Sequence, residues 1–303
     1  MNCSFETPIL FLIFNRPDTT VRIFEEIRKR KPKYLFVAAD GARTTKTGEA
    51  ELCLQTRDII KQVDWDCDVK TLFREQNLGC GKAVSSAITW FFENVEQGII
   101  LEDDCLPHPD FFNYCEELLN KYKENEQVML ISGDNFQNGT KRGEASYYFS
   151  AYPHIWGWAT WQRSWNKYDF TLENYSSKEF KVILKEYFRL WTEQQFWLNK
   201  FLLIKKQAIN TWDYQFTFTI WENKGLAILP NVNLVSNIGF TDNSTHTNDP
   251  NHKLANIPTF NILPLLHPTI IERNRVADEY YYKVYNYKTT LKIFYRIICR
   301  YFL

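Results

Sequence analysis

Short apolar runs alternate with amphipathic stretches over the first 132 residues of the chain. The first run, at 8–14, lacks polar alternation, which is typical of a strand buried on both faces of a sheet. The runs predict strands at 8–14, 34–39, 69–73, 98–101 and 127–132. Apolar residues at helical spacing between the runs predict helices at 17–31, 48–63, 82–94 and 109–123. This alternation indicates an α/β fold, with a mostly parallel sheet flanked by helices on both faces.

The second half of the chain has a weaker pattern. Residues 178–206 predict a helix, and residues 217–221 and 227–229 could each form a strand. Residues 240–259 are a polar loop, long enough to predict a functional or a disordered segment.

Polar residues follow each predicted strand of the first half. They are Arg16, Asp40, the segment 77–82, the triplet Glu102, Asp103 and Asp104, and the pair Asp134 and Asn135. The carboxyl ends of parallel strands meet at one edge of a sheet, and ligands of such folds bind at that edge. The sequence therefore predicts a binding site built from these residues.

Composition excludes several classes of protein. The 36 Lys and Arg residues equal the 36 Asp and Glu residues, whereas a nucleic-acid-binding domain normally has a basic excess. Charged residues make up 24% and hydrophobic residues 45%, which excludes a disordered chain. The early apolar runs are far shorter than the ~20 residues of a membrane span. Scattered cysteines and the absence of a signal peptide predict a cytoplasmic protein.

The acidic triplet Glu102, Asp103 and Asp104 closes an apolar strand, and three adjacent carboxylates repel one another. Mn²⁺ or Mg²⁺ would compensate, because these cations prefer oxygen ligands and often use one or two carboxylates together with substrate phosphates. A solvated acidic turn is the alternative. The place of the triplet at the end of a sheet strand favours the metal site.

Several other phosphate and nucleophile motifs are absent from the sequence. The chain has neither the Walker A pattern nor a G-x-G-x-x-G after the first strand. It also has no acid directly after the first strand and no G-x-S-x-G elbow. A nucleotide-sugar site, in which metal and diphosphate meet at the fourth strand, is the chemistry that remains.

Two nearby segments carry a resemblance to a known family. Residues 101–104 followed by Pro109-Asp110-Phe111-Phe112 resemble the metal-binding segment of GT-A-fold glycosyltransferases. The likeness is closest to the N-acetylglucosaminyltransferase I group and to related bacterial polysaccharide glycosyltransferases. Further matching segments follow in the same order, at 131–135, 157–165, 212–213 and 230–246.

The resemblance implies how the chain is organised. Residues 1–270 would form a single GT-A domain, with a nucleotide-binding half at 1–135 and an aromatic-rich acceptor-side half at 136–270. A C-terminal basic amphipathic tail would follow at 271–303.

The resemblance also implies roles for single residues. Asp104 would bind the metal directly, and Asp213 would be the catalytic base of an inverting transfer. The residues implied to contact the nucleotide sugar are Arg16, Asp40, Glu102, Asp103, Ser244 and His246.

Other positions have two interpretations from the residues alone. Asp213 could instead cap the helix that follows it. Lys82 lies at a Gly-rich helix start, where it could bind phosphate or simply be exposed. Asp134 and Asn135 could contact the acceptor or form an Asx-turn.

Tryptophan is concentrated in one part of the chain. Eight of the ten tryptophans lie between Trp156 and Trp221. Aromatic side chains can cover the apolar faces of sugar rings, so we predict acceptor contacts from Trp158 and Trp212, near Asp213. The other tryptophans of the cluster are expected partly in the core.

The end of the chain predicts a basic amphipathic helix. Lys288, Lys292, Arg296 and Arg300 recur at four-residue spacing beside an apolar surface. Such a helix could contact an anionic membrane peripherally or could dock on the domain with its lysines outward.

Together these features predict an inverting glycosyltransferase that depends on Mn²⁺ or Mg²⁺. It would move a sugar from a nucleotide-diphosphate donor, expected to be UDP-linked, to a hydroxyl of a glycan or glycolipid acceptor. The expected setting is synthesis of a bacterial cell-surface polysaccharide, such as lipopolysaccharide, at the cytoplasmic face of the membrane. The alternatives are a sugar-phosphate nucleotidylyltransferase and a non-catalytic carbohydrate-binding protein on a degenerate transferase scaffold.

Overall fold

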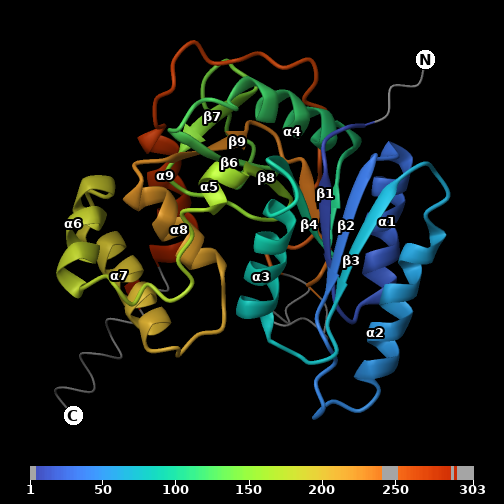
Figure 1. Ribbon diagram of the computed structural model, residues 1–303. Coiled ribbons are helices and arrows are strands. Elements are labelled where there is room, and N and C mark those ends of the chain that lie inside the picture. The colour runs from blue at the N-terminus through green and yellow to red at the C-terminus, as the bar shows by residue number, and fades with distance from the viewer. Residues whose placement is uncertain (1–4, 241–251, 288–289, 292–303) are drawn as a thin grey trace.

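The computed structural model of the chain describes residues 5–240, 252–287 and 290–291, and is built around one large sheet (Figure 1). The strands of this sheet are β1 (Ile9–Ile13), β2 (Tyr34–Ala39), β3 (Asp68–Phe73), β4 (Gln97–Glu102), β6 (Val128–Ser132), β7 (Tyr147–Ser150), β8 (Trp158–Trp161) and β9 (Leu226–Pro230). A smaller sheet pairs β5 (Cys105–Pro107) with β10 (Val235–Asn237).

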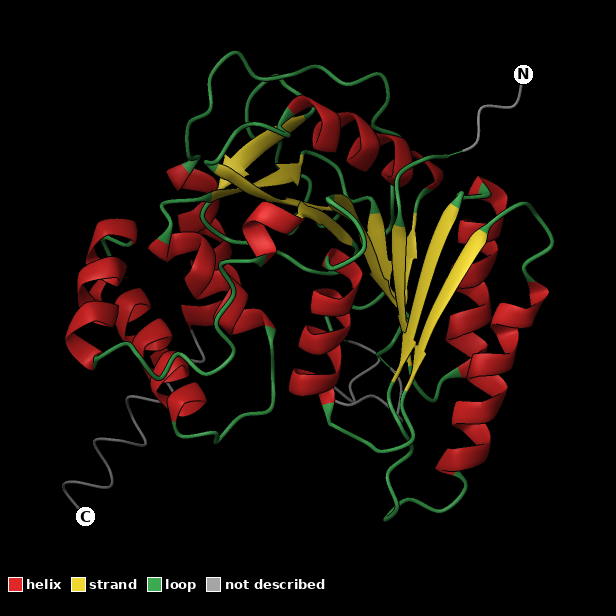
Figure 2. Ribbon diagram, in the orientation of Figure 1, coloured by secondary structure: helices red, strands yellow, loops and turns green. Residues whose placement is uncertain are grey.

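The helices lie on both faces of the large sheet (Figure 2). They are α1 (Pro17–Arg30), α2 (Glu49–Asp58), α3 (Cys80–Phe92), α4 (Pro109–Lys121), α5 (Gln162–Trp165), α6 (Ser177–Tyr187), α7 (Trp191–Lys205), α8 (Asp213–Glu222) and α9 (Arg275–Tyr281). A 3₁₀ turn, η1 (Ile59–Gln62), follows α2, and a π turn, η2 (Tyr282–Asn286), follows α9.

The large sheet has the strand order β3-β2-β1-β4-β8-β6-β9-β7. β1 pairs in parallel with both β2 and β4, and β2 pairs in parallel with β3. β8 is antiparallel to its neighbours β4 and β6, whereas β6 and β9 are parallel. The carboxyl ends of β1 to β4 therefore meet at one edge, as predicted.

The alternation of side chains along β1 explains why its sequence is apolar throughout. Ile9, Phe11 and Ile13 pack into one core cluster, together with α1 and α4. Leu10 and Leu12 pack into a second cluster on the other face, together with α3, α7 and α8. Figure 1 shows α1 and α2 on one side of β1 to β3 and α3 on the other. The predicted α/β class, with a mostly parallel sheet flanked by helices, is confirmed.

Two predictions for the second half are wrong. The single helix expected at 178–206 is interrupted between α6 and α7, because Phe188 leaves the helical path and packs against Trp221, with ring centroids 4.9 Å apart. The strand considered at 217–221 lies instead within α8. Every residue from Gln215 to Trp221 is buried, polar ones included, so this segment has no exposed polar face that would distinguish a helix from a strand.

Most of the clustered tryptophans are core residues. The buried ones other than Trp161 form one aromatic layer with phenylalanines and tyrosines of α6, α7 and α8, whereas Trp161 packs into the other core cluster. The buried ones are Trp158, Trp161, Trp165, Trp197, Trp212 and Trp221. The aromatic excess of this half is therefore mainly a packing feature.

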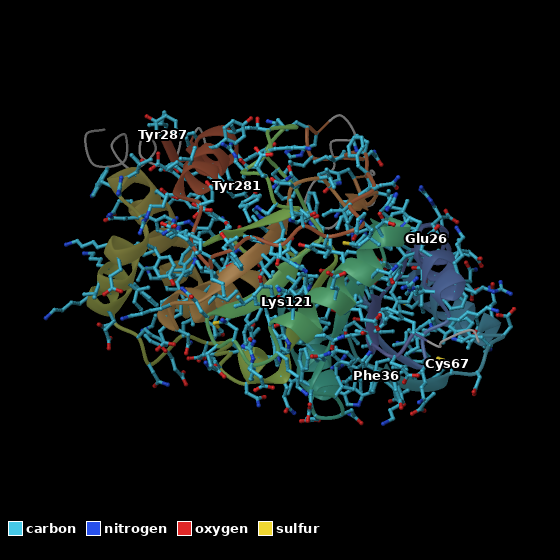
Figure 3. All side chains as sticks on the ribbon, turned by 90° about the horizontal axis from the view of Figure 1, so that it is seen from above. Glu26, Phe36, Cys67, Lys121, Tyr281 and Tyr287 are labelled. Atoms are coloured by element: carbon cyan, nitrogen blue, oxygen red, sulfur yellow. The ribbon has the colours of Figure 1, made fainter. Side chains whose placement is uncertain are left out.

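The described part of the segment 271–303 packs against the rest of the molecule. The Tyr281 ring lies 4.5 Å from the His154 ring, centroid to centroid, and Tyr282 is fully buried. Seen from above, Tyr281 and Tyr287 lie at the opposite end of the molecule from Glu26 and Cys67 (Figure 3). The predicted basic stripe of Lys288 to Arg300 lies outside the described residues. Over the described ranges, no helix is long and apolar enough to cross a membrane.

Candidate functional site

A cavity of about 800 Å³ opens at the carboxyl ends of β1, β2 and β4. One wall comes from these strand ends and the start of α3. The other wall comes from α7, the loop before α8, and residues around 155–156 and 237–240. A volume in this range accommodates a drug-sized or nucleotide-sized ligand. The edge predicted from the sequence is therefore the edge at which the cavity lies.

The acidic triplet and Arg16 belong to the wall formed by the strand ends. The Arg16 guanidinium is 2.6 Å from Asp103 Oδ1 and 2.8 Å from Asp104 Oδ2. Asp103 also accepts a hydrogen bond from the backbone amide of Phe14, at 3.1 Å. Arg16, Asp103 and Asp104 thus join the ends of β1 and β4. The sequence prediction placed Arg16 near the nucleotide, and here its guanidinium is held by the acids.

The charges of the triplet are only partly compensated. Burial raises the pKa of Glu102, and the neighbouring Asp104 and Asp103 raise it further. Burial also raises the pKa of Asp103, although Arg16 opposes the shift. Burial alone would lower the pKa of Arg16, but Asp103 and Asp104 raise it above its usual value. With all three carboxylates ionised, one guanidinium would leave an excess of two negative charges, and the raised pKa values of Glu102 and Asp103 reflect the cost of that state.

This donor set fits a divalent cation. Carboxylate oxygens are the ligands that Mg²⁺ and Mn²⁺ prefer, and the excess charge matches the charge of such an ion. Within the described ranges no group of three or more His, Cys, Asp or Glu side chains is arranged to hold a metal alone. A cation bound here would therefore need oxygen atoms from a substrate, as Mg²⁺ sites with substrate phosphates commonly do.

The backbone at Ile238 and Gly239 lies close to Arg16 and Asp104. We call the part of the cavity formed by Arg16 and the acidic triplet the charged corner. The Ile238 amide donates to the Asp104 carbonyl at 2.8 Å, which continues the pairing of β5 with β10. A Cβ added to Gly239 would lie 2.2 Å from Asp104 Oδ2 and 2.8 Å from an Arg16 nitrogen. Only glycine leaves room at this position for the Arg16–Asp104 pair.

Asp40 lines the cavity, but its carboxylate has protein partners. It accepts hydrogen bonds from the backbone amides of Gly41, Leu78 and Gly79, each at 3.0 Å. A nucleotide base bound by Asp40 would have to share the carboxylate oxygens with these three amides. In this structure Asp40 fixes the turn that leads into α3.

The Gly-rich start of α3 is also occupied by the protein itself. The Gly81 amide donates to Asn210 Oδ1 at 2.9 Å, so the loop before α8 covers this helix end. Lys82 is exposed on α3 and does not line the cavity. The structure thus places Lys82 outside the cavity, as the exposed-lysine interpretation expects, and the Gly81 amide is already used by Asn210.

Asp213 lies on the opposite wall, as the first residue of α8. Its carboxylate accepts a hydrogen bond from the Thr211 hydroxyl. Burial raises its pKa, and hydrogen bonds from Thr211 and the start of the helix oppose the shift. The N-cap position of α8 is Trp212, so Asp213 does not cap the helix as one sequence interpretation expected, and it lines the cavity from the first helical position. Its role as a catalytic base stays a prediction.

The two tryptophans predicted to contact the acceptor differ in position. Trp212 lines the cavity, although little of it is accessible. Trp158 is wholly buried in β8 and stacks on Trp212, with ring centroids 5.5 Å apart. The structure therefore places Trp158 behind Trp212 and away from the cavity.

Asp134 and Asn135 follow β6 but turn into the protein. Asp134 accepts a hydrogen bond from the Trp156 amide at 2.9 Å, and burial raises its pKa well above the usual value. Asn135 donates to the Pro230 carbonyl at 2.6 Å and accepts from the Gln137 amide at 2.9 Å. These two residues do not line the cavity, and Asp134 instead holds Trp156, which does. The Asx-turn interpretation describes Asn135 correctly.

The loop residues Ser244 and His246 lie outside the described part of the chain. Sequence reasoning missed several residues that line the cavity, namely Arg74, Lys200, Asn210, Thr211 and Gly239. A basic residue directly after the third strand is the signal that could have indicated Arg74. The others have no local signal, because they reach the cavity only through the packing of the second half.

No family model matches the chain, and no curated protein matches its sequence. Solved structures that are similar include HddC of Yersinia pseudotuberculosis, at 10% identity and a TM-score of 0.33, covering 54% of this chain and 80% of that one. A cytidylyltransferase of Leptospira borgpetersenii is similar at 12% identity and a TM-score of 0.35, covering 68% and 74%. A UDP-glucose pyrophosphorylase in complex with UDP-glucose is similar at 12% identity and 0.31, covering 54% and 78%. Identities of 10–12% and TM-scores of 0.31–0.35 do not indicate a function, so the proposed function depends on the residues of this chain.

Proposed function

We propose that the protein is an inverting, metal-dependent glycosyltransferase that uses a nucleotide-diphosphate sugar, expected to be UDP-linked. One observation carries the proposal: the acidic triplet with Arg16 lines the cavity from the strand ends, and the carboxylate of Asp213 lines the same cavity from the start of α8. A charged corner for the diphosphate and a separate base for an acceptor are the two parts that such a transfer requires.

The donor half of the reaction would depend on the triplet. Asp104 would be the direct ligand of Mn²⁺ or Mg²⁺, with Glu102 and Asp103 supporting the cation and the sugar nucleotide. The bound cation would neutralise negative charge on the departing diphosphate. Arg16 would add a fixed positive charge beside it. Asp40 and the turn that it holds would border the nucleoside.

Asp213 would act on the acceptor. Its carboxylate would accept the proton of the acceptor hydroxyl while the oxygen of that hydroxyl attacks the anomeric carbon from the face opposite the leaving nucleotide. Burial, which raises the pKa of Asp213, makes the carboxylate a stronger base. The Thr211 hydroxyl fixes the orientation of the carboxylate.

The first test is the variant Asp213→Asn, which keeps the shape of the side chain but removes the base. We expect the rate of sugar transfer to fall by roughly 10²–10⁴, with the thermal unfolding temperature preserved. Asp66→Asn, at an exposed position away from the cavity, is the matched control and should transfer at the wild-type rate. Wild-type transfer by Asp213→Asn would remove this residue from the mechanism.

The released product separates the proposal from its alternatives. A glycosyltransferase releases the nucleoside diphosphate, whereas a sugar-phosphate nucleotidylyltransferase forming a nucleotide sugar releases pyrophosphate. The segment after β1 begins α1 with Pro17 and supplies no Gly-rich phosphate loop, which argues against the second enzyme. Binding of UDP-sugars without release of either product would indicate a carbohydrate-binding protein.

The proposed setting is synthesis of a bacterial cell-surface polysaccharide, with a glycan or glycolipid acceptor. Peripheral membrane contact by the C-terminal segment belongs to the same proposal. Co-sedimentation of the full chain with anionic lipid vesicles checks that contact, and equal sedimentation of a chain lacking residues 288–303 would count against it.

A further inference from the structure

Lys200 is a charged residue that lines the cavity and takes no part in the proposed transfer of the sugar. It lies on α7 and lines the same wall as Trp212, Asp213 and Tyr214. Its ammonium group is 4.8 Å from the centroid of the Tyr214 ring and 5.5 Å from that of Phe196. Cation–π contacts of this kind attract the ammonium group to the aromatic rings and do not neutralise its charge.

Lys200 has no ion-pair partner among the described residues, unlike two other cations of the cavity. Arg16 is paired with the acidic triplet, and Arg43 forms an ion pair with Glu49. Within the described ranges, no carboxylate lies at ion-pair distance from Lys200. Burial accordingly lowers the pKa of Lys200. A half-buried ammonium without a carboxylate partner is costly, and an anionic ligand would relieve that cost.

The position of Lys200 assigns it to the acceptor part of the cavity. Asp213 is the carboxylate whose charge raises the pKa of Lys200, and the acidic triplet has no comparable effect on it. The triplet and Arg16 occupy the other wall, where the diphosphate is expected. A group recognised by Lys200 would therefore lie beside the hydroxyl that Asp213 activates.

We propose that Lys200 recognises an anionic substituent of the acceptor, so that the acceptor sugar carries a carboxylate or a phosphate near the reacting hydroxyl. A lysine ammonium is a compact point charge that suits either anion. Aromatic surface from Trp156 and Tyr214, which also line the cavity, would cover the apolar face of the same sugar ring. This inference rests on the proposed function, because it assumes that Asp213 marks the acceptor subsite.

Direct binding of three sugars to the full chain, in the presence of Mn²⁺ and UDP, tests the inference. The probes are methyl β-D-glucuronide, glucose 6-phosphate and the neutral methyl β-D-glucoside, followed by tryptophan fluorescence. We expect at least one charged sugar to bind the wild type roughly tenfold more tightly than the glucoside. The charged sugar that is preferred distinguishes a carboxylate from a phosphate.

Substitutions of Lys200 test whether this residue causes the preference for a charged sugar. Lys200→Met should abolish the preference for the charged sugar, and Lys200→Arg should retain most of it. Lys206→Met, at an exposed lysine following the same helix, is the matched control and should behave as the wild type. Equal affinities of the wild type for charged and neutral sugars would overturn the inference. So would a Lys200→Met variant that loses UDP affinity while keeping the preference.

The two proposals fail in distinguishable ways. Metal-dependent UDP binding is measured separately by calorimetry on the same preparations. Absence of UDP binding in the wild type would overturn the proposed function. Intact UDP binding with no preference among the sugars would overturn only the role of Lys200.

Discussion

Gly239 is the residue at which the site tolerates the least change. A methyl group there would lie 2.2 Å from Asp104 Oδ2, a separation that forces either the backbone or the Arg16–Asp104 pair to move. Overpacking of this kind typically costs about 1–3 kcal/mol. The contact between Arg16 and Asp104 therefore requires a residue without a Cβ at position 239.

The variant Gly239→Ala should accordingly weaken binding of UDP in the presence of Mn²⁺ by tenfold or more, measured by calorimetry, since ~1.4 kcal/mol corresponds to tenfold. Gly139→Ala is the control: a Cβ there would meet nothing within 4 Å, and the backbone strain expected from its φ of +80° arises at a residue that does not line the cavity. That control should bind UDP as the wild type does. Unchanged binding by Gly239→Ala would contradict the geometry described for this corner.

His154 predicts a pH dependence of stability at a position away from the cavity. Its Nε2 atom is buried without a partner, and burial lowers its pKa to about 3. The unfolded chain binds this proton near pH 6.5. The folded state therefore loses stability as the pH falls from about 6.5 towards about 3, by up to ~1.4 kcal/mol per pH unit.

The variant His154→Phe removes the titrating group and keeps a ring to pack on Tyr281. The difference in free energy of unfolding between variant and wild type, measured by urea denaturation, should shift in favour of the variant as the pH falls from 7 to 4.5. Other buried groups titrate equally in both proteins and cancel in the difference. Parallel stability curves over this range would show that His154 is not the group responsible.

Among single residues, the sequence indicated those that directly follow β1, β2 and β4. Arg16, Asp40 and the triplet all line the cavity, because parallel strands bring their ends to one edge. The same rule did not determine what each side chain does there. Asp40 binds backbone amides, and Asp134 points inward to hold Trp156, because backbone groups of nearby turns need partners.

At the scale of elements, α6, α7 and α8 support one wall of the cavity through aromatic packing. The Phe201 ring lies 5.3 Å from that of Phe180 and 5.1 Å from that of Phe218, between centroids. Phe201 is fully buried, so these contacts fix α7 against α8. Lys200 and Asp213 are carried by these two helices, and their relative positions depend on this layer.

Truncation of that ring tests the role of the layer. Phe201→Ala should lower the free energy of unfolding by about 3–5 kcal/mol, because the ring leaves a cavity that its neighbours cannot fill. Val182→Ala, at a half-exposed position on α6, should change stability by less than about 0.5 kcal/mol. Urea denaturation of both variants measures the difference. Equal effects would mean that the aromatic layer is not well packed.

Helices and strands with a clear pattern of apolar and polar positions were predictable, and elements without such a pattern were not. The five strands expected in the first half are present; all but β3 are apolar runs, and β3 has the mixed, mostly exposed sequence of a strand at the edge of the sheet. The break between α6 and α7 was not visible, since both helices are rich in aromatic residues. Short strands such as β5 and β10 depend on each other across more than a hundred residues, and no local pattern predicts such pairing.

On the scale of the whole molecule, the cavity is a joint product of both halves of the sequence. Strand ends from the first half supply the charged corner, and helices from the second half supply Asp213, Lys200 and aromatic surface. The zero net charge of the chain conceals this separation of charged groups. Separate subsites for donor and acceptor on facing walls are what a group transfer between two sugars needs.

The central claim is that the acidic triplet binds a nucleoside diphosphate through a divalent cation. Calorimetric titration of the full chain with UDP, with Mn²⁺ and then with EDTA, tests this claim most directly, alongside the variant Asp104→Asn. We expect UDP to bind in the presence of Mn²⁺, and removal of the metal or of the Asp104 charge to weaken binding at least tenfold. UDP binding of equal strength with and without Mn²⁺, or unaffected by Asp104→Asn, would show that the triplet does not bind the diphosphate through a metal.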